Sequence, residues 1–383
     1  MEQRSVIRNT FDEWELHVDE VLHRVRTIVD AYSLDALILS RSASIAWATG
    51  GLSPRIDRSA DSDPIWLIVS KDSAVIVTNV VEAERLGSEN RAEVAYFSSF
   101  VTVPWSPTTA YAEVCAQLCG NRFGIDRPGF GGVDVSDDLV VERLSLTGFA
   151  QSEIRSIGGD VTEAIETSAR SWSPGEMDRE IAARLCFELE RRGIEPSVIL
   201  VGGDERVRSF RHPVAIGEAI GEYLMLVVVG MRKGLHVATT RFATSRKLSV
   251  TENRRFFELA AIQSMVVSHA KPGNSYGMLY GTLDEGYRIF GHAGGWREHF
   301  QGGPIGYQQR EFEISPEDGT SKWYDQVVKP GSAVAFNPSL SGGFKVEDTY
   351  LVASTVAECI TRSEDWPLIE VGEAFSVAGV LEI

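Results

Sequence analysis

The chain has 383 residues, 43% of them hydrophobic and 24% charged, and its formal net charge is −17. The length accommodates two domains, and the composition is that of an ordinary globular protein. The negative charge argues against nucleic-acid binding, which needs clustered Lys and Arg, and against an anionic membrane surface. The sequence contains neither the apolar core of a signal peptide near its start nor the roughly twenty apolar residues of a membrane helix.

The four cysteines are Cys115, Cys119, Cys186 and Cys359, and no two of them form a CxxC pair. Cys115 and Cys119 stand four residues apart in a helical pattern, which favours two core thiols over a disulfide bridge. A reducing compartment fits this usage best, so we expect a cytoplasmic protein.

The first part of the chain alternates predicted strands and helices. Apolar residues at helical spacing predict a helix over Glu15–Ala31, and a second helix is expected over Tyr111–Leu118. Predicted strands cover 36–39, 65–69, 74–77 and 122–126, the middle two as a hairpin joined through Lys71 and Asp72, and a further apolar run spans 45–48. This pattern is typical of a mixed α/β domain, which we expect to end near residue 155.

The remainder of the chain has a more antiparallel character. A helix is predicted to open at Gly175–Asp178, with acidic residues in its first turn, and to run to about Arg192. Further predicted helices span 252–268 and 275–289, and predicted strands span 197–201, 223–230, 235–242, 333–336, 349–353 and 368–371. The sequence therefore predicts a second domain of the α+β class over residues 156–383.

Two segments of this second domain carry a family resemblance. They are His299-Phe300-Gln301-Gly302-Gly303 and the run from Gly343 to Thr349, about forty residues later. In order and spacing they resemble the pita-bread family of methionine aminopeptidases, prolidases and creatinase. The resemblance implies an α+β chain of two domains, an N-terminal creatinase-like α/β domain over 1–155 and a C-terminal pita-bread domain over 156–383.

The metal ligands of that family are largely missing at the matching positions. The resemblance places its two ligand Asp residues on Val227 and Ala238, its ligand His on His299, and its two ligand Glu residues on Asn337 and Glu347. A pair of divalent ions needs several carboxylates to balance their charge and bridge them. We therefore predict no metal and no other cofactor.

Creatinase is a metal-free precedent on this scaffold, and ectoine hydrolases resemble it. Its loop histidine, which shuttles a proton, matches His212, and its last glutamate matches Glu347. Its other guanidinium-binding glutamate falls on Thr240, which argues against creatine as the substrate because a guanidinium would lose one carboxylate partner. The resemblance also implies a homodimer.

The predicted catalytic residues are His212, His299 and Glu347. A near-neutral imidazole at His212 is suited to take a proton from water and give it to a leaving nitrogen. Glu347 would orient the substrate or bind its cation, and His299 would donate to the developing oxyanion. The alternatives are a surface loop histidine at His212 and inherited scaffold without a chemical role at His299 and Glu347.

The predicted substrate-binding residues are His236, Thr240, Asn337, Tyr307, Arg310 and Arg55. His236 and Thr240 share a strand face with Ala238, and the alternative for His236 is a strand-end histidine with a satisfied hydrogen bond. The glycines around Gly302–Gly306 would let a ligand approach the backbone. Tyr307 and Arg310 follow them, with a structural Arg310–Glu311 contact as the alternative. Arg55 lies in a Gly/Pro-broken loop and is suited to grip a carboxylate, or is simply solvated.

These expectations combine into one functional prediction with two alternatives. The prediction is a hydrolase without metal that cuts a non-peptide amide or amidine C–N bond in a small amino-acid-derived substrate. The alternatives are a non-hydrolytic lyase or isomerase that uses the same cavity, and a binding module without enzymatic activity. In each case we expect no nucleic-acid or membrane partner.

Overall fold

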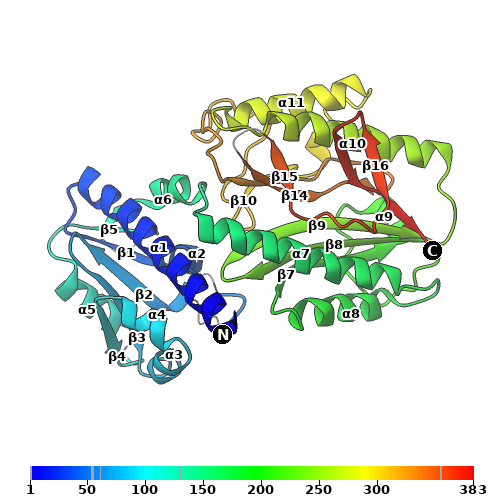
Figure 1. Ribbon diagram of the computed structural model, residues 1–383. Coiled ribbons are helices and arrows are strands. Elements are labelled where there is room, and N and C mark those ends of the chain that lie inside the picture. The colour runs from blue at the N-terminus through cyan, green and yellow to red at the C-terminus, as the bar shows by residue number, and fades with distance from the viewer. Residues whose placement is uncertain (1, 53–55, 61, 108, 129–130, 354–355) are drawn as a thin grey trace. The chain divides into compact units, whose positions relative to one another are not determined.

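The computed structural model describes residues 2–383, apart from 53–55, 61, 108, 129–130 and 354–355 (Figure 1). The chain forms two compact units. The first comprises residues up to 143 together with 147–150, and the second comprises 144–146 and 151–383. Each unit has its own sheets and its own buried core.

The first unit is built on a single six-stranded sheet in the order β4-β3-β2-β1-β5-β6. Its strands are β1 Ala36–Arg41, β2 Ser62–Ser70, β3 Ala74–Asn79, β4 Ser99–Val103, β5 Phe123–Ile125 and β6 Val133–Asp134. Its helices are α1 Glu2–Ala31, α2 Ser42–Thr49, α3 Ala83–Glu89, α4 Arg91–Tyr96, α5 Ala110–Leu118 and α6 Ser136–Arg143. The pairs β1–β2 and β2–β3 are antiparallel, whereas β1–β5, β3–β4 and β5–β6 are parallel.

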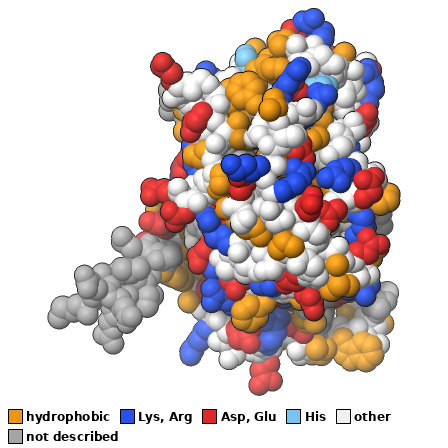
Figure 2. Space-filling view, turned by 90° about the vertical axis from the view of Figure 1, so that its right-hand side faces the viewer, with side chains coloured by type: hydrophobic (Ala, Val, Ile, Leu, Met, Phe, Trp, Pro, Cys, Tyr) orange, Lys and Arg blue, Asp and Glu red, His pale blue; other side chains and the backbone are white. Residues whose placement is uncertain are grey.

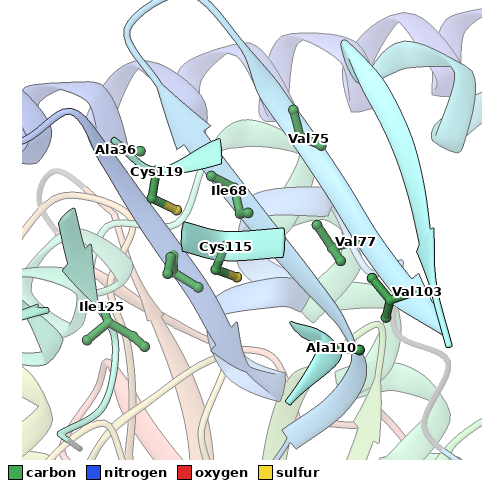
Figure 3. Close-up of a cluster of buried hydrophobic side chains, with 10 residues drawn as sticks. Ala36, Ile68, Val75, Val77, Val103, Ala110, Cys115, Cys119 and Ile125 are labelled. Atoms are coloured by element: carbon green, nitrogen blue, oxygen red, sulfur yellow. The ribbon is translucent and has the colours of Figure 1, made fainter. Parts of the chain in front are cut away.

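Both faces of this sheet are buried. Ile38 on β1 packs in a cluster with Ile68 on β2 and with Cys115 and Cys119 of the α5 segment (Figure 3). Leu37 alternates with Ile38 along β1 and is also fully buried, because successive strand residues point to opposite faces. The two cysteines are free core thiols, as the sequence predicted.

The second unit contains two four-stranded sheets, β18-β9-β8-β7 and β10-β11-β14-β15. The strands are β7 Glu195–Gly203, β8 Tyr223–Arg232, β9 Leu235–Thr244, β10 Gly302–Ile305, β11 Ala333–Phe336, β14 Asp348–Val352, β15 Ala357–Cys359 and β18 Val380–Glu382. Two short ribbons pair β12 Ser339–Leu340 with β13 Phe344–Lys345, and β16 Leu368–Val371 with β17 Phe375–Ala378. The helices are α7 Gly148–Arg170, α8 Asp178–Glu190, α9 Asp204–Ser209, α10 Val250–His269 and α11 Tyr276–Ile289, with a 3-10 turn at Gly295–Glu298.

Within this unit the strands lie between two pairs of helices, with α7 and α8 on one side and α10 and α11 on the other (Figure 1). The long hairpin β8–β9 turns through Lys233 and Gly234, whose φ angles are 53° and 79°. Two consecutive positive φ angles define the hairpin turn whose twist matches that of the strands, which explains a glycine at the second position.

Acidic and basic side chains are intermixed over the face of the molecule seen in Figure 2. Among the described residues, arginines pair with glutamates along helices, as Arg85 does with Glu89 at 3.0 Å. Ion pairs between exposed side chains contribute little stability one by one. No helix of the described residues is long and apolar enough to cross a membrane.

The predicted fold class is confirmed, since both units are mixed α/β or α+β. The apolar run at 45–48, which the sequence left without a structure, belongs to helix α2, and the 23-residue helix α7 was not predicted. The expected division at residue 155 stays a prediction.

Candidate active site

A cavity of about 80 Å³ lies between the two sheets of the second unit. Its lining includes the apolar residues Val198, Leu200, Val227, Val229 and Ala238 and the polar residues His212, Arg310, Asn337, Lys345 and Glu347.

The Glu347 carboxylate is the centre of the polar wall. Its Oε2 accepts a hydrogen bond from the Thr240 hydroxyl at 2.6 Å and forms an ion pair with Lys345 Nζ at 2.9 Å. Its Oε1 accepts from Asn337 Nδ2 at 3.2 Å. All four side chains are buried, with exposed fractions of 4–7%. A buried carboxylate persists when its charge is paired and its oxygens are hydrogen-bonded, and both conditions are met here.

Strand β9 brings Thr240 to Glu347. The Thr240 amide donates to the Glu347 carbonyl at 3.1 Å, and Thr349 Oγ1 both accepts from the Ala238 amide at 3.0 Å and donates to its carbonyl at 2.8 Å. On the other face of β9, Arg241 forms an ion pair with Asp348 at 2.9 Å. These contacts fix β9 against the segment that carries Glu347. The position of Thr240 relative to Glu347 therefore follows from contacts of the backbone.

His212 and His299 form a direct contact beside this wall. Their Nε2 atoms are 3.0 Å apart, and their ring centroids are 4.9 Å apart in an edge-to-face arrangement. One Nε2 must carry a proton that the other accepts. His212 lines the cavity, whereas His299 lies against His212 and borders a smaller hollow with Arg211 and Lys345.

The surroundings keep both imidazoles neutral at neutral pH. Burial, followed by the charge of Lys345, lowers the pKa of His299 to about 3. Burial and the charges of Lys345 and Arg310 also lower the pKa of His212, while Glu347 opposes the shift. A neutral His299 can accept a proton from His212 in a hydrogen bond without becoming charged itself.

The loop that carries His212 is anchored by Asp178, a residue whose role the sequence did not indicate. The Asp178 carboxylate accepts from the amides of Ile216, Gly217 and Glu218 at 2.7–3.2 Å and from Arg206 at 3.1 Å. Asp178 had been noted only as an acidic residue at a helix start. Arg211, next to His212, forms an ion pair with Glu298, next to His299. The histidine contact is thus held from both sides.

The remaining predicted site residues fall into three groups. Asn337, Arg310 and Thr240 are at the cavity or on Glu347, and Arg310 also lies 3.9 Å from the ring centroid of Phe300 and pairs with Glu313. His236 and Tyr307 are buried, and His236 is bonded to the Gly306 carbonyl through its amide at 2.8 Å and through Nδ1 at 3.1 Å. Arg55 lies outside the described residues.

The glycine pair after His299 is explained by packing. Gly302 and Gly303 have φ angles of 83° and 147° and line the cavity. A Cβ on Gly302 would lie 2.0 Å from the Ala335 carbonyl oxygen, and one on Gly303 would lie 2.4 Å from the Tyr280 hydroxyl. Close approach of β11 and α11 therefore requires glycine at both positions, independently of any ligand.

The described side chains do not fit a pair of metal ions. They include no group of three or more His, Cys, Asp or Glu placed to hold a cation. Val227 and Ala238 contribute only hydrocarbon to the cavity, and the oxygens of Glu347 are bound by Thr240, Asn337 and Lys345. We derive no catalytic step through a metal.

Comparison with known proteins finds chains of the same fold. Residues 22–130 match the creatinase/prolidase N-terminal domain. A prolidase from Pyrococcus horikoshii superposes with a TM-score of 0.72 at 16% identity, covering 90% of this chain and 99% of that one. The chain therefore has the fold of this prolidase. The Xaa-Pro dipeptidase from Bacillus anthracis is similar too, with a TM-score of 0.70, 19% identity, and coverage of 90% and 98%.

A protein similar to this chain in sequence indicates which type of bond to consider. An Xaa-Pro dipeptidase from Pyrococcus furiosus is 20% identical over 367 residues, which cover 90% of this chain and 98% of the relative. Because the similar proteins are dipeptidases and prolidases, the prediction of a metal-independent hydrolase for non-peptide C–N bonds is wrong. That prediction gave too much weight to the missing metal-ligand residues and to the match of His212 and Glu347 with creatinase. Cytoplasmic location and homodimeric assembly stay predictions.

Proposed function

We propose that this chain hydrolyses the peptide bond of a short peptide in the cavity of its pita-bread unit. The observation that carries the proposal is the contact between the neutral His212 and His299 at a cavity that also holds the Lys345–Glu347 ion pair. The similarity to dipeptidases supports the bond type. The dipeptidases among the similar proteins support a short substrate.

His212 is the proposed base and acid. Its Nδ1 takes a proton from water as the water oxygen attacks the peptide carbonyl carbon, while its Nε2–H stays hydrogen-bonded to the neutral Nε2 of His299, 3.0 Å away. The proton on Nδ1 then passes to the peptide nitrogen as the C–N bond breaks. The products are a carboxylic acid, which contains the water oxygen, and a free amine.

His299 acts through His212 and is a positioning residue in this scheme. Its pKa of about 3 keeps its ring neutral, so it stabilises the imidazolium as a hydrogen-bond acceptor and does not compete for the proton. The role first predicted for His299, donation to an oxyanion, is replaced by this one because its Nε2 faces His212.

The test is turnover of a defined mixture of dipeptides, with and without proline at the second position, followed by mass spectrometry of the products. We expect cleavage by the wild type and a loss of about 10²- to 10⁴-fold in His212→Asn, the usual contribution of a general acid–base group. His269→Asn is the matched control, since His269 is bonded to the Met265 carbonyl on α10 and does not line the cavity. Folded wild-type protein that cleaves no dipeptide, or full activity in His212→Asn, would refute the proposal.

A further inference from the structure

Lys345 lies on β13 with 6% of its surface exposed, and its ammonium enters the cavity wall beside Glu347. At the site where the family's metal ligands are missing, the chain thus provides a positive charge through the Lys345 ammonium. An ammonium has three N–H donors, and the contact with Glu347 Oε2 at 2.9 Å uses one of them. The charge of Lys345 also acts on both histidines, since it lowers the pKa of each.

Asn337 gives a second, independent observation. It is 7% exposed and lines the cavity, and its Nδ2 donates to Glu347 Oε1 at 3.2 Å. Because the carboxylate can only accept, this bond sets the orientation of the amide and turns Oδ1 away from Glu347. Oδ1 is buried and has no hydrogen-bond partner among the described residues. A buried acceptor left in this state is costly, and a ligand N–H would satisfy it.

We propose that Lys345 and Asn337 form a recognition pair for a compact aminoacyl compound, one with a free amine next to a carbonyl group. The Lys345 ammonium binds the carbonyl oxygen of the ligand, and Asn337 Oδ1 accepts from its amine. This inference rests on the proposed function for the bond that is cut, and it adds the part of the substrate that is recognised.

The geometry favours a compact ligand because one carboxylate bridges the two groups. Lys345 binds Oε2 of Glu347 and Asn337 binds Oε1, so the donor and the acceptor stand side by side along the same wall. Val227 and Ala238, which also line the cavity, offer only hydrocarbon. A ligand whose amine and carbonyl are on neighbouring carbons can therefore reach both groups at once.

Isothermal titration calorimetry of the full chain with three probes tests whether Lys345 and Asn337 recognise the carbonyl and the amine of a ligand. The probes are L-alaninamide, N-acetyl-L-alaninamide, which lacks a free amine, and propionamide, which has no amine at that carbon. We expect alaninamide to bind at least tenfold more tightly than the other two. Lys345→Met should weaken alaninamide at least tenfold and Lys345→Arg less, while Asn337→Ala should abolish the preference for the free amine. Lys322→Met, at an exposed lysine over Trp323, is the control and should bind as the wild type does.

Since Lys345→Met leaves Glu347 buried without its cation, a second variant guards against misfolding. Lys345→Met/Glu347→Met removes both charges and should fold, with the same loss of binding. Binding unchanged in that double variant, equal affinity for the acetylated probe, or no binding of alaninamide to folded wild type would overturn the inference. If His212→Asn binds alaninamide normally while the wild type cleaves no dipeptide, the recognition pair stands and the proposed hydrolysis fails.

Discussion

Replacing Arg241 with methionine removes the guanidinium from a buried ion network next to the cavity. Arg241 is 1% exposed and forms ion pairs with Asp348 at 2.9 Å and Glu166 at 3.1 Å. It also donates to Thr239 Oγ1 at 2.7 Å and to the Thr240 carbonyl at 3.0 Å. Methionine retains much of the volume but leaves two buried carboxylates without their cation.

The expected loss of stability follows from that burial. Removing one partner of a buried ion pair costs about 3–5 kcal/mol, because the remaining charge is uncompensated. For a unit of this size each kcal/mol corresponds to roughly 2–4 °C in Tm, so the transition of the second unit should fall by roughly 6–20 °C. Arg254→Met is the control: the Arg254 side chain is 75% exposed, and its buried partner Glu258 keeps Arg255 at 3.0 Å and His292 at 2.9 Å, so the change should cost less than about 1 kcal/mol.

Urea titration followed by hydrogen exchange and mass spectrometry measures the effect on the second unit alone, through peptides from β9 and β14. A variant with Arg241, Glu166 and Asp348 all replaced by apolar residues should recover part of the loss, since apolar packing often replaces a buried ion network at little cost. A cost for Arg241→Met no greater than that for Arg254→Met would refute the assignment of this network as a buried, paired one.

Three further predictions concern the site. The pKa of His299 is about 3 in the folded chain and 6.5 as its ordinary value, so between these pH values the unfolded chain binds a proton that the folded chain does not. The free energy of unfolding of the wild type therefore falls as pH falls from 6.5 towards 3. His299→Asn should lose less free energy of unfolding over this window in paired denaturation curves. Asp178→Asn should weaken the anchoring of the His212 loop, seen as faster hydrogen exchange at 216–218, and should lower kcat more than it raises KM. Glu347→Gln should weaken the ion pair with Lys345 and lower alaninamide affinity, whereas the same change at exposed Glu373 should leave that affinity unchanged.

Much of the fold follows from local sequence signals. The β8–β9 hairpin was predictable because two apolar runs flank Lys233-Gly234, a dipeptide suited to a turn with positive φ. Helix α7 was missed because the expected domain boundary at 155 fell inside it and Gly158 and Gly159 weaken its helical signal. The run at 45–48 shows the ambiguity of short apolar stretches, which suit a buried strand or a buried helix equally well.

The site was only partly accessible from sequence. Glu347 was identified through the resemblance, but Lys345 was overlooked, although two residues of separation along an extended segment put both side chains on one face. The contact between His212 and His299 joins positions 87 residues apart in the sequence, and no local sequence pattern predicts a contact between residues so far apart. The orphaned oxygen of Asn337 depends on which way its amide is turned, and this is decided by Glu347 in three dimensions.

The most direct test of the central claim is cleavage of dipeptides in water enriched in ¹⁸O. The account predicts free amino acids, with one solvent oxygen in the newly formed carboxylate for each bond cut, and loss of this product in His212→Asn but not in His269→Asn. Folded protein that yields no labelled amino acid from any dipeptide would contradict peptide-bond hydrolysis by this chain.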